Sequence, residues 1–399
     1  MANVSSSNGL EKRPKLRFPG FDEQYKQCRI GDIYAERSQR GASDMELLSV
    51  TMNDGVKPRS EIEGKDNSSE DKSNYKIVRK GDMVYNSMRM WQGANGISPC
   101  DGIVSPAYTV LMPKQEINNG YFAALFKSTK LINEFRKNSQ GMTSDTWNLK
   151  YPQIETIKVQ IPSVSEQDKV SALFSVLDAR IVAQAQLVES LKKYKRGVMQ
   201  SIFRHSTQEG WKTVKLGEIF KKVSRRNTNG DIKNVITNSA EYGLIPQRDF
   251  FDKDIAVDGN TSNYYVIEEG DFVYNPRKSN TAPYGPFNRY TLKEKGIISP
   301  LYTCLVLQED INPAYLAWYF KSDAWYRYIY DNGSQGVRHD RVSMTDDLLM
   351  GIPVSVPTVS KQKKVAEILD AVEYRLSAAQ GEYDTLVKLK NGFMQQLFI

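Results

Sequence analysis

Residues 161–203 read IPSVSEQDKVSALFSVLDARIVAQAQLVESLKKYKRGVMQSIF, and residues 356–398 read VPTVSKQKKVAEILDAVEYRLSAAQGEYDTLVKLKNGFMQQLF. Each stretch has proline at its second position and none after it, so no proline interrupts a helix there. Ser165 and Ser360 are the expected N-cap residues, because a serine hydroxyl accepts hydrogen bonds from the unpaired N–H groups of a first helical turn. The two stretches therefore predict two long helices of similar sequence.

An apolar stripe follows each predicted helix, mostly at steps of three and four residues, which is the spacing of one helix face and close to a coiled-coil heptad. The stripe consists of Val170, Leu173, Leu177, Ile181, Leu187, Val188, Leu191, Tyr194 and Val198 in the first helix, and of Val365, Ile368, Val372, Leu376, Leu386, Leu389 and Phe393 in the second. About 38 residues at 1.5 Å each give a rod of roughly 55 Å, which cannot bury its stripe alone. We expect the two helices to pair as an intramolecular antiparallel coiled coil.

The chain reads block, helix, block, helix, which predicts two mixed α/β domains related by a pseudo-two-fold axis. The expected divisions are an N-terminal arm at 1–20, a first domain at 21–160, a first helix at 161–205, a second domain at 206–355 and a second helix at 356–399. The two long helices would then act as a spacer between the two domains.

Matched segments recur in both blocks in the same order. They are a short strand with a Gly-acid turn at 25–33 and 211–219, a Gly-Asp turn and strand at 78–86 and 267–275, strands at 103–110 and 297–304, an amphipathic helix at 117–128 and 311–322, and a Ser-Gln-Gly loop at 139–141 and 334–336. Residues 53–74 are rich in Gly, Ser, Asp and Asn and predict an exposed loop, with a polar counterpart at 249–262.

The composition excludes several classes of protein. Apolar residues make up 40% of the 399 residues, which allows two or three folded domains, and the net charge of +7 suggests a polyanionic partner. Cys28, Cys100 and Cys304 are odd in number and far apart, which argues against a disulfide framework and for the reducing cytoplasm. No run of about 18 apolar residues exists and residues 1–20 lack an apolar signal core, so we expect no membrane span and no secretory signal.

The motifs do not indicate a catalytic site. His205 and His339 lie in unrelated contexts, and no metal-ligand spacing, P-loop or glycine-rich dinucleotide turn is present. Residues 274–277 (Tyr-Asn-Pro-Arg) lack the second proline and the aromatic residue of the amino-methyltransferase motif Asn-Pro-Pro-aromatic. Residues 63–65 have the Glu-x-Lys spacing of a nuclease metal site but lie in loop-like sequence. We therefore expect no metal and no cofactor on this chain.

Basic and amide side chains in or beside predicted turns are the candidate DNA-binding residues. The set is Arg37, Arg40, Arg89, Gln140 and Asn148 in the first block, and Arg225, Arg226, Arg277, Lys278, Gln335, Arg338, His339 and Arg341 in the second. Arginine hydrogen-bonds guanine, Asn or Gln hydrogen-bonds adenine, and Lys or Arg binds phosphate. Each can be an ordinary surface residue, but the recurrence in both blocks favours DNA contact, and the differences favour two unlike target sequences.

Two further groups have structural alternatives. Tyr108 and Tyr302 are matched aromatic residues in predicted strands, where core packing is favoured over base stacking. Residues 192–196 carry four basic side chains near the end of the first helix. Such a run is an ordinary solvated face, or it lines the backbone of bound DNA.

Several motifs together are typical of one family. They are Arg-Pro-Lys-Leu-Arg-Phe-Pro-Gly-Phe at 13–21, Gly-Asp-x-Val-Tyr-Asn at 81–86, Gly-Ile-Val-Ser-Pro-Ala-Tyr at 102–108, Ile-Pro-x-x-x-Glu-Gln at 161–167, and Met-Gln-x-x-Phe at 199–203 and 394–398. Over essentially its whole length the chain resembles the specificity subunit of bacterial type I restriction-modification systems. Its one small departure is Lys361, which stands where the first helix has Glu166.

The resemblance implies two target-recognition domains, each reading one half of a split, asymmetric site in double-stranded DNA, and no catalysis by this chain. It implies two methyltransferase subunits that use S-adenosylmethionine to methylate adenine, and two motor-nuclease subunits that use ATP, with Mg²⁺ also on the partner subunits. We expect the methyltransferase subunits on the outer faces of the helices and on residues 13–25.

Two other functions stay open on the sequence alone. One is a self-contained DNA nuclease or methyltransferase, which would turn over when supplied with S-adenosylmethionine, Mg²⁺ and DNA. The other is a protein scaffold that does not touch nucleic acid, for which DNA binding would be absent or insensitive to salt.

Overall fold

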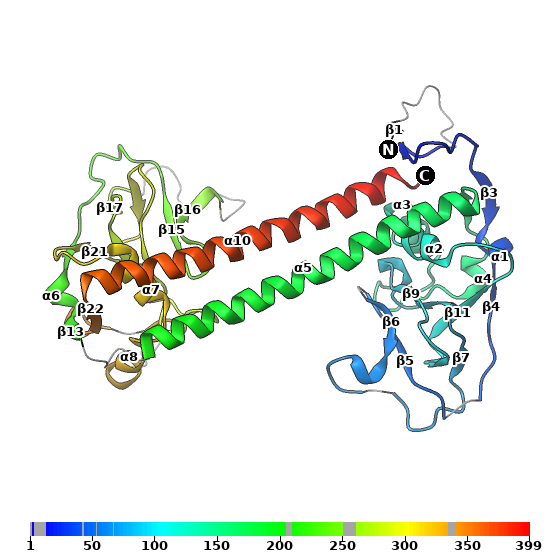
Figure 1. Cartoon of the computed structure of the whole chain (residues 1–399), viewed down its shortest axis with the longest axis horizontal. Coiled ribbons are helices and arrows are strands. Elements are labelled where there is room, and N and C mark those ends of the chain that lie inside the picture. Colours follow the sequence, from blue (N-terminus) through cyan, green and yellow to red (C-terminus); the bar gives the residue numbers. More distant parts are fainter. Residues whose placement is uncertain are drawn as a thin grey trace. The chain divides into compact units, whose positions relative to one another are not determined.

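The computed structural model describes residues 2–3, 13–41, 44–52, 54–66, 68–204, 210–249, 261–333, 340–342 and 344–399. The chain packs as two compact units, with Met1–Gln186 and Gln380–Ile399 in unit 1 and Leu187–Ala379 in unit 2. Two long helices, α5 (Val164–Arg204) and α10 (Val359–Gln396), contribute to both units (Figure 1). Each unit therefore combines one repeated block with part of each long helix.

Unit 1 is a mixed α/β fold. Its strands are β1 (Ala2–Asn3), β2 (Leu16–Arg17), β3 (Lys26–Arg29), β4 (Tyr34–Glu36), β5 (Leu48–Thr51), β6 (Gly55–Pro58), β7 (Lys76–Val78), β8 (Met83–Asn86), β9 (Asn95–Ile97), β10 (Gly102–Val104), β11 (Tyr108–Pro113) and β12 (Lys158–Ile161). Its shorter helices are α1 (Ile30–Ile33), η1 (Arg59–Glu61), η2 (Met90–Gln92), α2 (Asn119–Leu125), α3 (Thr129–Asn138) and α4 (Tyr151–Ile154). Strands β4, β11, β8 and β9 form an antiparallel sheet in that order.

Unit 2 repeats this architecture. Its strands are β13 (Trp211–Lys215), β14 (Phe220–Val223), β15 (Ile236–Ser239), β16 (Gly243–Pro246), β17 (Tyr265–Ile267), β18 (Phe272–Tyr274), β19 (Phe287–Arg289), β20 (Gly296–Ile298), β21 (Thr303–Leu307) and β22 (Pro353–Pro357). Its shorter helices are α6 (Leu216–Ile219), η3 (Gln247–Asp249), α7 (Pro313–Lys321), α8 (Tyr326–Asn332) and α9 (Asp346–Met350). The sheet order β14, β21, β18, β19 matches that of unit 1, which confirms the predicted repeat.

Successive residues of the central strands point into two different cores. In β8, Tyr85 belongs to the larger core of unit 1 with α2 and α3, whereas Val84 belongs to a smaller core with the β5–β6 hairpin. In β18, Tyr274 and Val273 divide in the same way. Because both faces of the sheet are covered, these strands read as continuous apolar runs. The partly buried Tyr108 and Tyr302 pack against the smaller cores, as predicted.

Within each unit the long helices run antiparallel, as the sequence predicts. In unit 1, the rings of Phe174 and Phe398 stack with centroids 5.7 Å apart, and Lys390 Nζ lies 2.5 Å from Asp178 Oδ1. The residue numbers of the contacts thus increase along α5 while they decrease toward and along α10, as in an antiparallel pair. The core of unit 2 likewise joins the last turn of α5 to early turns of α10.

One pair of hydrogen bonds joins the start of each long helix to its block. Gln167 Oε1 accepts from the N–H of Asn118 at 3.0 Å, and its Nε2 donates to the carbonyl of the proline five residues earlier at 3.0 Å. Gln362 makes the same bonds, to Asn312 at 2.8 Å and to its own proline at 2.9 Å. Both glutamines are buried. The first turn of each long helix is thereby fixed to the start of α2 or α7.

A buried ion pair holds the N-terminal segment on α5. The Nε and Nη2 of Arg17 donate to the two carboxylate oxygens of Glu166 at 2.9 and 2.7 Å, and the hydroxyl of Tyr25 donates to Glu166 at 3.2 Å. Arg17 is 4% exposed and Glu166 is 1% exposed. The matching residue of α10, Lys361, is exposed and has no acceptor atoms on its side chain, so it cannot replace Glu166 in such a contact.

The predicted N-caps are wrong. Helix α5 begins at Val164, so Ser165 lies inside its first turn, and α10 begins at Val359, so Ser360 does as well. The N–H of Gln167 donates to the carbonyl of Ser163 at 3.0 Å, which extends the helical hydrogen bonding back toward the preceding proline. Each long helix therefore begins two residues after its proline and one residue before the serine that was predicted as its N-cap.

The buried face of the long helices also differs in part from the predicted stripe. Of the predicted residues, Val170, Leu177, Val188, Val365, Val372 and Leu386 are buried, whereas Leu187, Tyr194, Ile368 and Leu389 are between 45% and 59% exposed. Phe174 and Leu369 are buried in their place. Because an α-helix repeats every 3.6 residues, the irregular steps along the predicted stripe spread its positions over a wider arc than the buried face.

The predicted loop at residues 53–74 is wrong at its start, where β6 pairs with β5 as a hairpin. Thr51 Oγ1 donates to the carbonyl of Gly55 at 3.1 Å and accepts from the N–H of Asp54 at 2.9 Å. Gly55 has φ of 72°, a conformation that glycine adopts without strain. The polar residues around β6 obscured its strand pattern in the sequence. The counterpart segment at 249–262 lies largely outside the described residues.

By length and composition alone, one helix of the described chain, α5, would reach across a membrane, with a mean hydropathy of 1.2 over an 18-residue window that is 17% buried. The same helix carries Asp178 and Arg180, which form ion pairs with Lys390 at 2.5 Å and Glu382 at 3.3 Å on α10. Charged side chains are costly in hydrocarbon, so these ion pairs favour the helix pair over a membrane span.

Candidate nucleic-acid interface

The Gly-Asp turn before the central strand is anchored by arginine in both units. The guanidinium of Arg37 donates to the two carboxylate oxygens of Asp82 at 2.7 and 3.1 Å. Arg225 donates through Nη2 to one oxygen of Asp271 and through Nη1 to Glu268 at 3.3 Å. The hydrogen bonds to Asp82 raise the pKa of Arg37, whereas burial raises the pKa of Asp271 against the lowering effect of Arg225. These contacts give Arg37 and Arg225 a part in the scaffold.

A second pair of predicted arginines also occupies matched positions. Arg40 forms an isolated bridge with Lys76 and contacts Asn74, whereas Arg226 forms a bridge with Tyr265 and donates to Asn263 Oδ1 at 2.9 Å. Both arginines are exposed beside the edge of their unit's smaller sheet. Their side chains are therefore accessible to a ligand.

The central strands end in the same turn in both units. Asn86 Oδ1 accepts from the N–H of Met88 at 3.0 Å, and Asn275 Oδ1 accepts from the N–H of Arg277 at 3.0 Å. These Asx turns reverse the chain just beyond the strand. The exposed Arg89 follows the first turn, and Arg277 and the partly exposed Lys278 lie in the second.

A second loop meets this turn in each unit, and we name the pair the loop junction: residues 86–92 with 139–149 in unit 1, and residues 275–279 with 340–342 in unit 2. In unit 1, the backbones of Gln140 and Asn148 exchange hydrogen bonds of 3.0 and 2.8 Å, and the N–H of Leu149 donates to the Ser87 carbonyl at 2.9 Å. In unit 2, the N–H of Val342 donates to the Pro276 carbonyl at 2.9 Å. The predicted residues Arg89, Gln140 and Asn148 are thus brought together, as are Arg277, Lys278 and Arg341.

The side chains at the two loop junctions differ in chemistry. In unit 1, Trp91 and Trp147 meet edge to face with centroids 5.2 Å apart, and the guanidinium of Arg136 lies 5.4 Å from the Trp91 ring. In unit 2, Asp340 Oδ2 lies 3.9 Å from Arg277 Nε and 3.6 Å from Arg341 Nε. The candidate residues Gln335, Arg338 and His339 lie outside the described residues.

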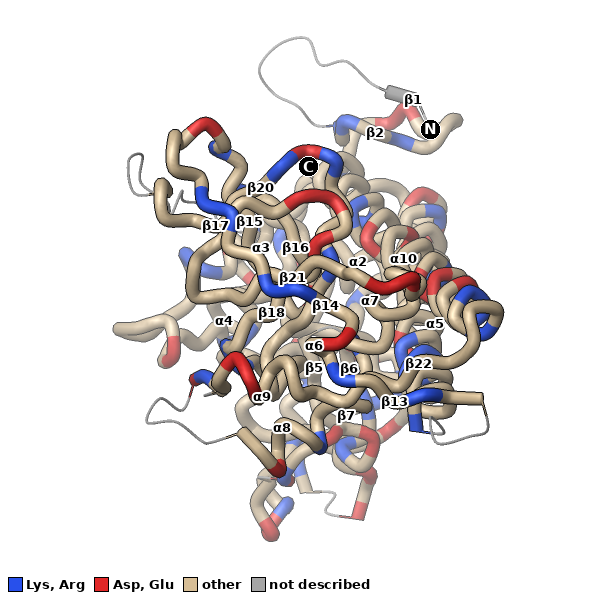
Figure 2. Tube along the Cα trace, turned by 90° about the vertical axis from the view of Figure 1, so that its left-hand side faces the viewer, with Lys and Arg blue, Asp and Glu red and all other residues tan. Residues whose placement is uncertain are grey.

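The charge of the molecule is not gathered in a single run. Figure 2 shows Lys and Arg interspersed with Asp and Glu along the chain, including the two long helices. Among the described residues, no group of three or more His, Cys, Asp or Glu side chains is placed to hold a metal ion. Local groups of basic and amide side chains, rather than a broad basic face, are therefore the candidate contacts for a polyanion.

A family model described as the type I restriction modification DNA specificity domain matches residues 23–193 and again residues 208–386. The chain belongs to the type I restriction-modification DNA specificity family. The two matches follow the structural repeat, since each spans one block and most of the long helix that follows it.

Relatives and solved structures of this family agree with the fold. The chain is 23% identical over 352 residues to the type I restriction enzyme MjaVIII specificity subunit of Methanocaldococcus jannaschii, covering 80% of this chain and 79% of the relative. It resembles the crystal structure of the type I restriction-modification S subunit from M. genitalium with a TM-score of 0.58 and 15% identity, over 97% of this chain and 99% of the other. A chain from a structural study of complex assembly and conformational transition of the type I R-M system gives 0.56 and 14%, over 96% and 99%.

Sequence reasoning missed two kinds of residue in this specificity-family fold. Trp91 and Trp147 link the loops of unit 1 and stand in polar loop sequence, where an isolated tryptophan is itself a signal of contact. Gln167 and Gln362 fix the long helices to the blocks, and their recurrence at the same place in both helices was the available signal.

Proposed function

We propose that this chain is the DNA-recognition subunit of a type I restriction-modification complex, in which each loop junction reads one half of a bipartite, asymmetric DNA site. The observation that carries the proposal is that the two loop junctions share a backbone hydrogen bond but have different side chains. The same N–H to carbonyl bond of 2.9 Å joins the two loops in both units, while indoles stand in unit 1 where an Asp-Arg cluster stands in unit 2. A shared frame with different side chains suits two different target sequences.

The chemistry of the loop junctions supports base and phosphate contact. In unit 1, Arg89, Gln140 and Asn148 offer the guanidinium and amide groups that pair with guanine and adenine in the major groove. In unit 2, Arg277 and Arg341 offer guanidinium groups, with Lys278 beside them for phosphate. Arg40 and Arg226, at the edge of the smaller sheets, are proposed phosphate contacts. The unplaced Gln335, Arg338 and His339 stay in the proposed set on sequence grounds.

The paired long helices are proposed as the spacer of the recognised site. Half-sites about one turn of DNA apart, near 35 Å, present their major grooves on the same face of the duplex. A helix of 41 residues at 1.5 Å per residue is long enough to bridge that distance. The buried Gln167 and Gln362 would keep each recognition block in register with its helix.

The proposed partners are double-stranded DNA, two methyltransferase subunits and two motor-nuclease subunits. Exposed apolar side chains on the long helices support protein docking there: Val176, Val182 and Leu389 in unit 1, and Leu187, Tyr194, Ile368 and Tyr374 in unit 2. Exposed apolar side chains of this kind would be covered if a partner helix packed along the pair. Residues 13–25, held on α5 through Arg17, extend the proposed docking surface in unit 1.

The catalytic chemistry is proposed to belong to those partners. S-adenosylmethionine, ATP and Mg²⁺ would bind the methyltransferase and motor-nuclease subunits, and this chain would supply recognition and spacing. Such a complex acts on the cell's own DNA and on incoming DNA, so we propose a cytoplasmic location.

Mapping methylated adenines in the source genome and then exchanging one block tests the proposal. Replacing residues 210–355 with the block of another family member is expected to change one half of the methylated site and leave the other half unaltered. Changes in both halves would contradict modular reading. The binding constant of the assembled methyltransferase complex for its site should also fall steeply with salt, because phosphate contacts release counterions.

The spacer role has a separate test. Deleting one heptad from α5 and the matching heptad from α10 keeps the buried face nearly in phase and shortens the helix pair by roughly 10 Å. The expected result is a methylated site with the same half-sites and a shorter gap. A site with an unchanged gap would rule out the spacer.

The alternative of a self-contained nuclease or methyltransferase has a direct assay. The purified chain is incubated with DNA, S-adenosylmethionine and Mg²⁺, and both methyl transfer and strand cleavage are measured. We expect turnover only after the methyltransferase subunit is added. Turnover by the chain alone would replace the proposed function with the enzymatic one.

A further inference from the structure

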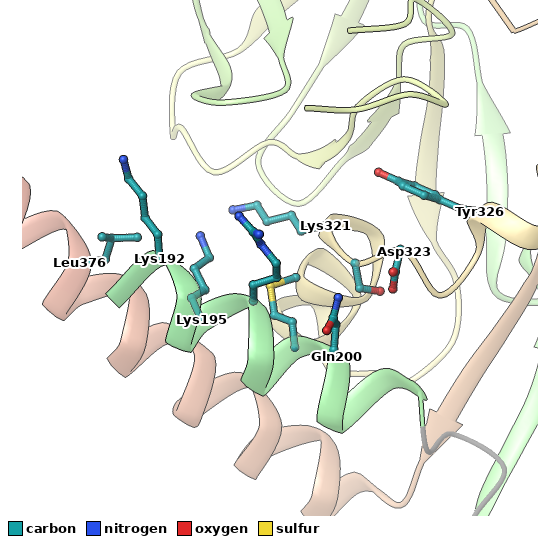
Figure 3. A pocket seen from close by; sticks show the side chains of 10 residues that line it. Lys192, Lys195, Gln200, Lys321, Asp323, Tyr326 and Leu376 are labelled. Carbon is teal, nitrogen blue, oxygen red and sulfur yellow. The ribbon is translucent and has the colours of Figure 1, made fainter. Parts of the chain in front are cut away.

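Each unit contains a cavity where its recognition block meets the long helices. The cavity of unit 2, of about 410 Å³, is lined by Lys192, Lys195, Arg196, Met199, Gln200, Lys321, Ser322, Asp323, Tyr326 and Leu376 (Figure 3). The cavity of unit 1, of about 680 Å³, lies among α2, α5 and α10 and is lined in part by Lys127, Phe174, Asp178, Lys390, Met394 and Gln395. The loop junctions are not part of either cavity.

The two cavities are built from matched positions of the repeat. The long helix that ends in each unit contributes a lysine, a methionine and a glutamine at an offset of 195: Lys195, Met199 and Gln200 in unit 2, and Lys390, Met394 and Gln395 in unit 1. The block contributes Lys321 at the end of α7 and Lys127 just after α2. This repetition sets the cavities apart from the loop junctions, where the two units differ.

The charges in each cavity are unbalanced. The helix lysine already has an acidic partner in both units, because Lys195 Nζ lies 2.5 Å from Glu373 Oε2 and Lys390 Nζ lies 2.5 Å from Asp178 Oδ1. Lys127 and Lys321 have no acid within ion-pair distance among the described residues. Four basic side chains and one acidic side chain line the cavity in unit 2, so an anion is the ligand that fits.

The environment of the two block lysines is unfavourable for an unpaired ammonium group. Desolvation lowers the pKa of Lys127, and the nearby charge of Lys390 lowers it further. Desolvation and Lys195 lower the pKa of Lys321 in the same way. In unit 2 the ring of Trp318 partly compensates, with Lys321 Nζ 4.7 Å and Lys195 Nζ 5.3 Å from its centroid. A carboxylate entering either cavity would relieve this imbalance.

The remaining walls are apolar. In unit 2, Met199, Leu376 and the ring of Tyr326 line the space beside the lysines, and Figure 3 shows Lys192 and Lys195 rising from α5 on the same side as Lys321. In unit 1, Phe174 and Met394 take this role. An acidic side chain has a charged head on a short apolar stem, which matches an ammonium group above an apolar wall.

We propose that the two cavities are equivalent docking sites for an acidic side chain of a partner protein, one copy of the same partner in each unit, with Lys127 and Lys321 as the pairing cations. This inference rests on the proposed function, which supplies the partner as the methyltransferase subunit. Matched cavities suit two copies of one protein, whereas the two unlike loop junctions suit two unlike DNA half-sites.

A DNA backbone fits the cavities less well. Phosphates of a duplex lie on a convex surface and are contacted by side chains that protrude, whereas Lys127 and Lys321 line concave, partly apolar spaces. Among the described residues, Lys127 is the one cation without an acidic partner in the unit 1 cavity, and Lys321 and Arg196 are the two in unit 2. So few unpaired cations suit one carboxylate better than a run of phosphates.

The two sites are unequal in strength. Lys192 and Arg196 add positive charge in unit 2, and the corresponding positions of α10 are Val387 and Asn391. When Lys321 is removed, Arg196 can still attract the carboxylate, whereas in unit 1 the only other described cation of the cavity, Lys390, is paired with Asp178. Removing the pairing lysine from unit 1 is therefore expected to have the larger effect on partner binding.

The test uses the full chain and the methyltransferase subunit of the same restriction system as the probe, with binding measured by titration calorimetry at two salt concentrations. Lys321→Met and Lys127→Met remove the charge and keep an unbranched apolar side chain, whereas Lys321→Arg and Lys127→Arg keep the charge. We expect about tenfold weaker binding for Lys127→Met, a smaller loss for Lys321→Met, near-unaltered binding for both arginine variants, and a weaker salt dependence in the methionine variants. Lys293→Met, on the exposed surface of unit 2 outside the cavity, is the matched control.

Three other outcomes have definite meanings. Equal methyltransferase binding by the original chain and by both methionine variants overturns this inference alone. Unaltered methyltransferase binding with weaker DNA binding by the assembled complex overturns it in favour of a DNA-backbone site. A chain that binds no methyltransferase subunit at all overturns the proposed function and this inference together. Thermal melting of each variant separates a folding defect from a docking defect, and the arginine variants keep the test decisive if a methionine variant unfolds.

Discussion

The loop junctions of the two units share a backbone and differ in what they present. Leu149 in unit 1 and Val342 in unit 2 donate the same 2.9 Å hydrogen bond to the facing loop, yet one junction is closed by Trp91 and Trp147 and the other by Asp340 between two arginines. The backbone contact fixes where the loops lie, so the side chains around it are free to change. Under the proposed function, a change of target sequence would therefore not require a change of fold.

At the starts of the long helices a side-chain contact, rather than a backbone contact, is shared by the two units. The buried side chains of Gln167 and Gln362 make the same two hydrogen bonds, whereas their neighbours Glu166 and Lys361 differ in charge and in burial. The glutamine contact therefore belongs to the fold common to both units. The contact of Arg17 with Glu166 occurs only in unit 1. The following experiments challenge these two comparisons.

The largest expected effect is on the buried ion pair. Arg17→Ala leaves the carboxylate of Glu166 buried without its cation, which is expected to cost roughly 3–5 kcal/mol of unfolding free energy in unit 1. Hydrogen exchange measured along the chain should show the loss in residues 13–29 and the first turns of α5. Lys361→Ala at the matching place in α10 is the control, with an expected change within about 0.5 kcal/mol. Equal effects would show that the two helix starts are not different after all.

Removing the shared contact should affect both units alike. Gln167→Leu and Gln362→Leu each leave a partly buried backbone N–H and a buried carbonyl without the glutamine partner, at an expected cost of about 1–3 kcal/mol. Urea unfolding of the two variants should give similar losses, and the double variant should lose the sum. A large loss from only one of them would show that the matched bonds are not equally important.

The loop junctions are expected to control one half-site each. Arg277→Ala should reduce discrimination at one base of the second half-site by about 1–3 kcal/mol, and Arg89→Ala should do the same only in the first. Methylation rates of the assembled complex on oligonucleotides with single base changes give both numbers. A uniform loss on every oligonucleotide, with a lower salt slope, would instead identify a phosphate contact.

The smallest expected effects concern the side chains that connect the two loops of each junction, the Trp91–Trp147 pair in unit 1 and Asp340 in unit 2. Trp147→Leu removes an edge-to-face contact worth about 0.5–1.5 kcal/mol. Asp340→Asn removes exposed ion pairs worth about 0–1 kcal/mol, and it should tighten DNA binding because it frees two arginines and removes a negative charge. Melting temperature and DNA affinity at two salt concentrations check both variants. Weaker DNA binding by Asp340→Asn would mean that the acid positions the arginines.

The sequence predicted the repeat, the antiparallel helices and the Gly-Asp turns, because each depends on local pattern or on similarity between the two halves. It did not predict the partner of Glu166, since Arg17 lies 149 residues away and nothing local links them. The contact of Trp91 with Trp147 was missed for the same reason. The N-caps and part of the helix stripe were wrong because a helix's start and phase depend on the tertiary contacts that it makes.

The candidate site was located more roughly than the fold. Sequence reasoning placed Arg89, Gln140 and Asn148 near related turns, and the structure brings them to one loop junction. It did not separate Arg37 and Arg225, whose guanidinium groups are engaged by Asp82 and Asp271, from the arginines without such a carboxylate partner in the Gly-Asp turn. That distinction depends on which carboxylate lies within reach, which spacing along the chain does not show.

The division of the chain has a consequence for its synthesis on the ribosome. Unit 2 is the continuous stretch Leu187–Ala379, whereas the core of unit 1 includes Leu397 and Phe398 as well as residues from the first half of the chain. Translation therefore delivers every residue of the second recognition block's unit before the first block's unit has its full core. The first block is synthesised earliest, but its core is completed only when Leu397 and Phe398 have been added. Until then unit 1 exposes part of its apolar core, and we expect a chaperone to bind this unit during synthesis.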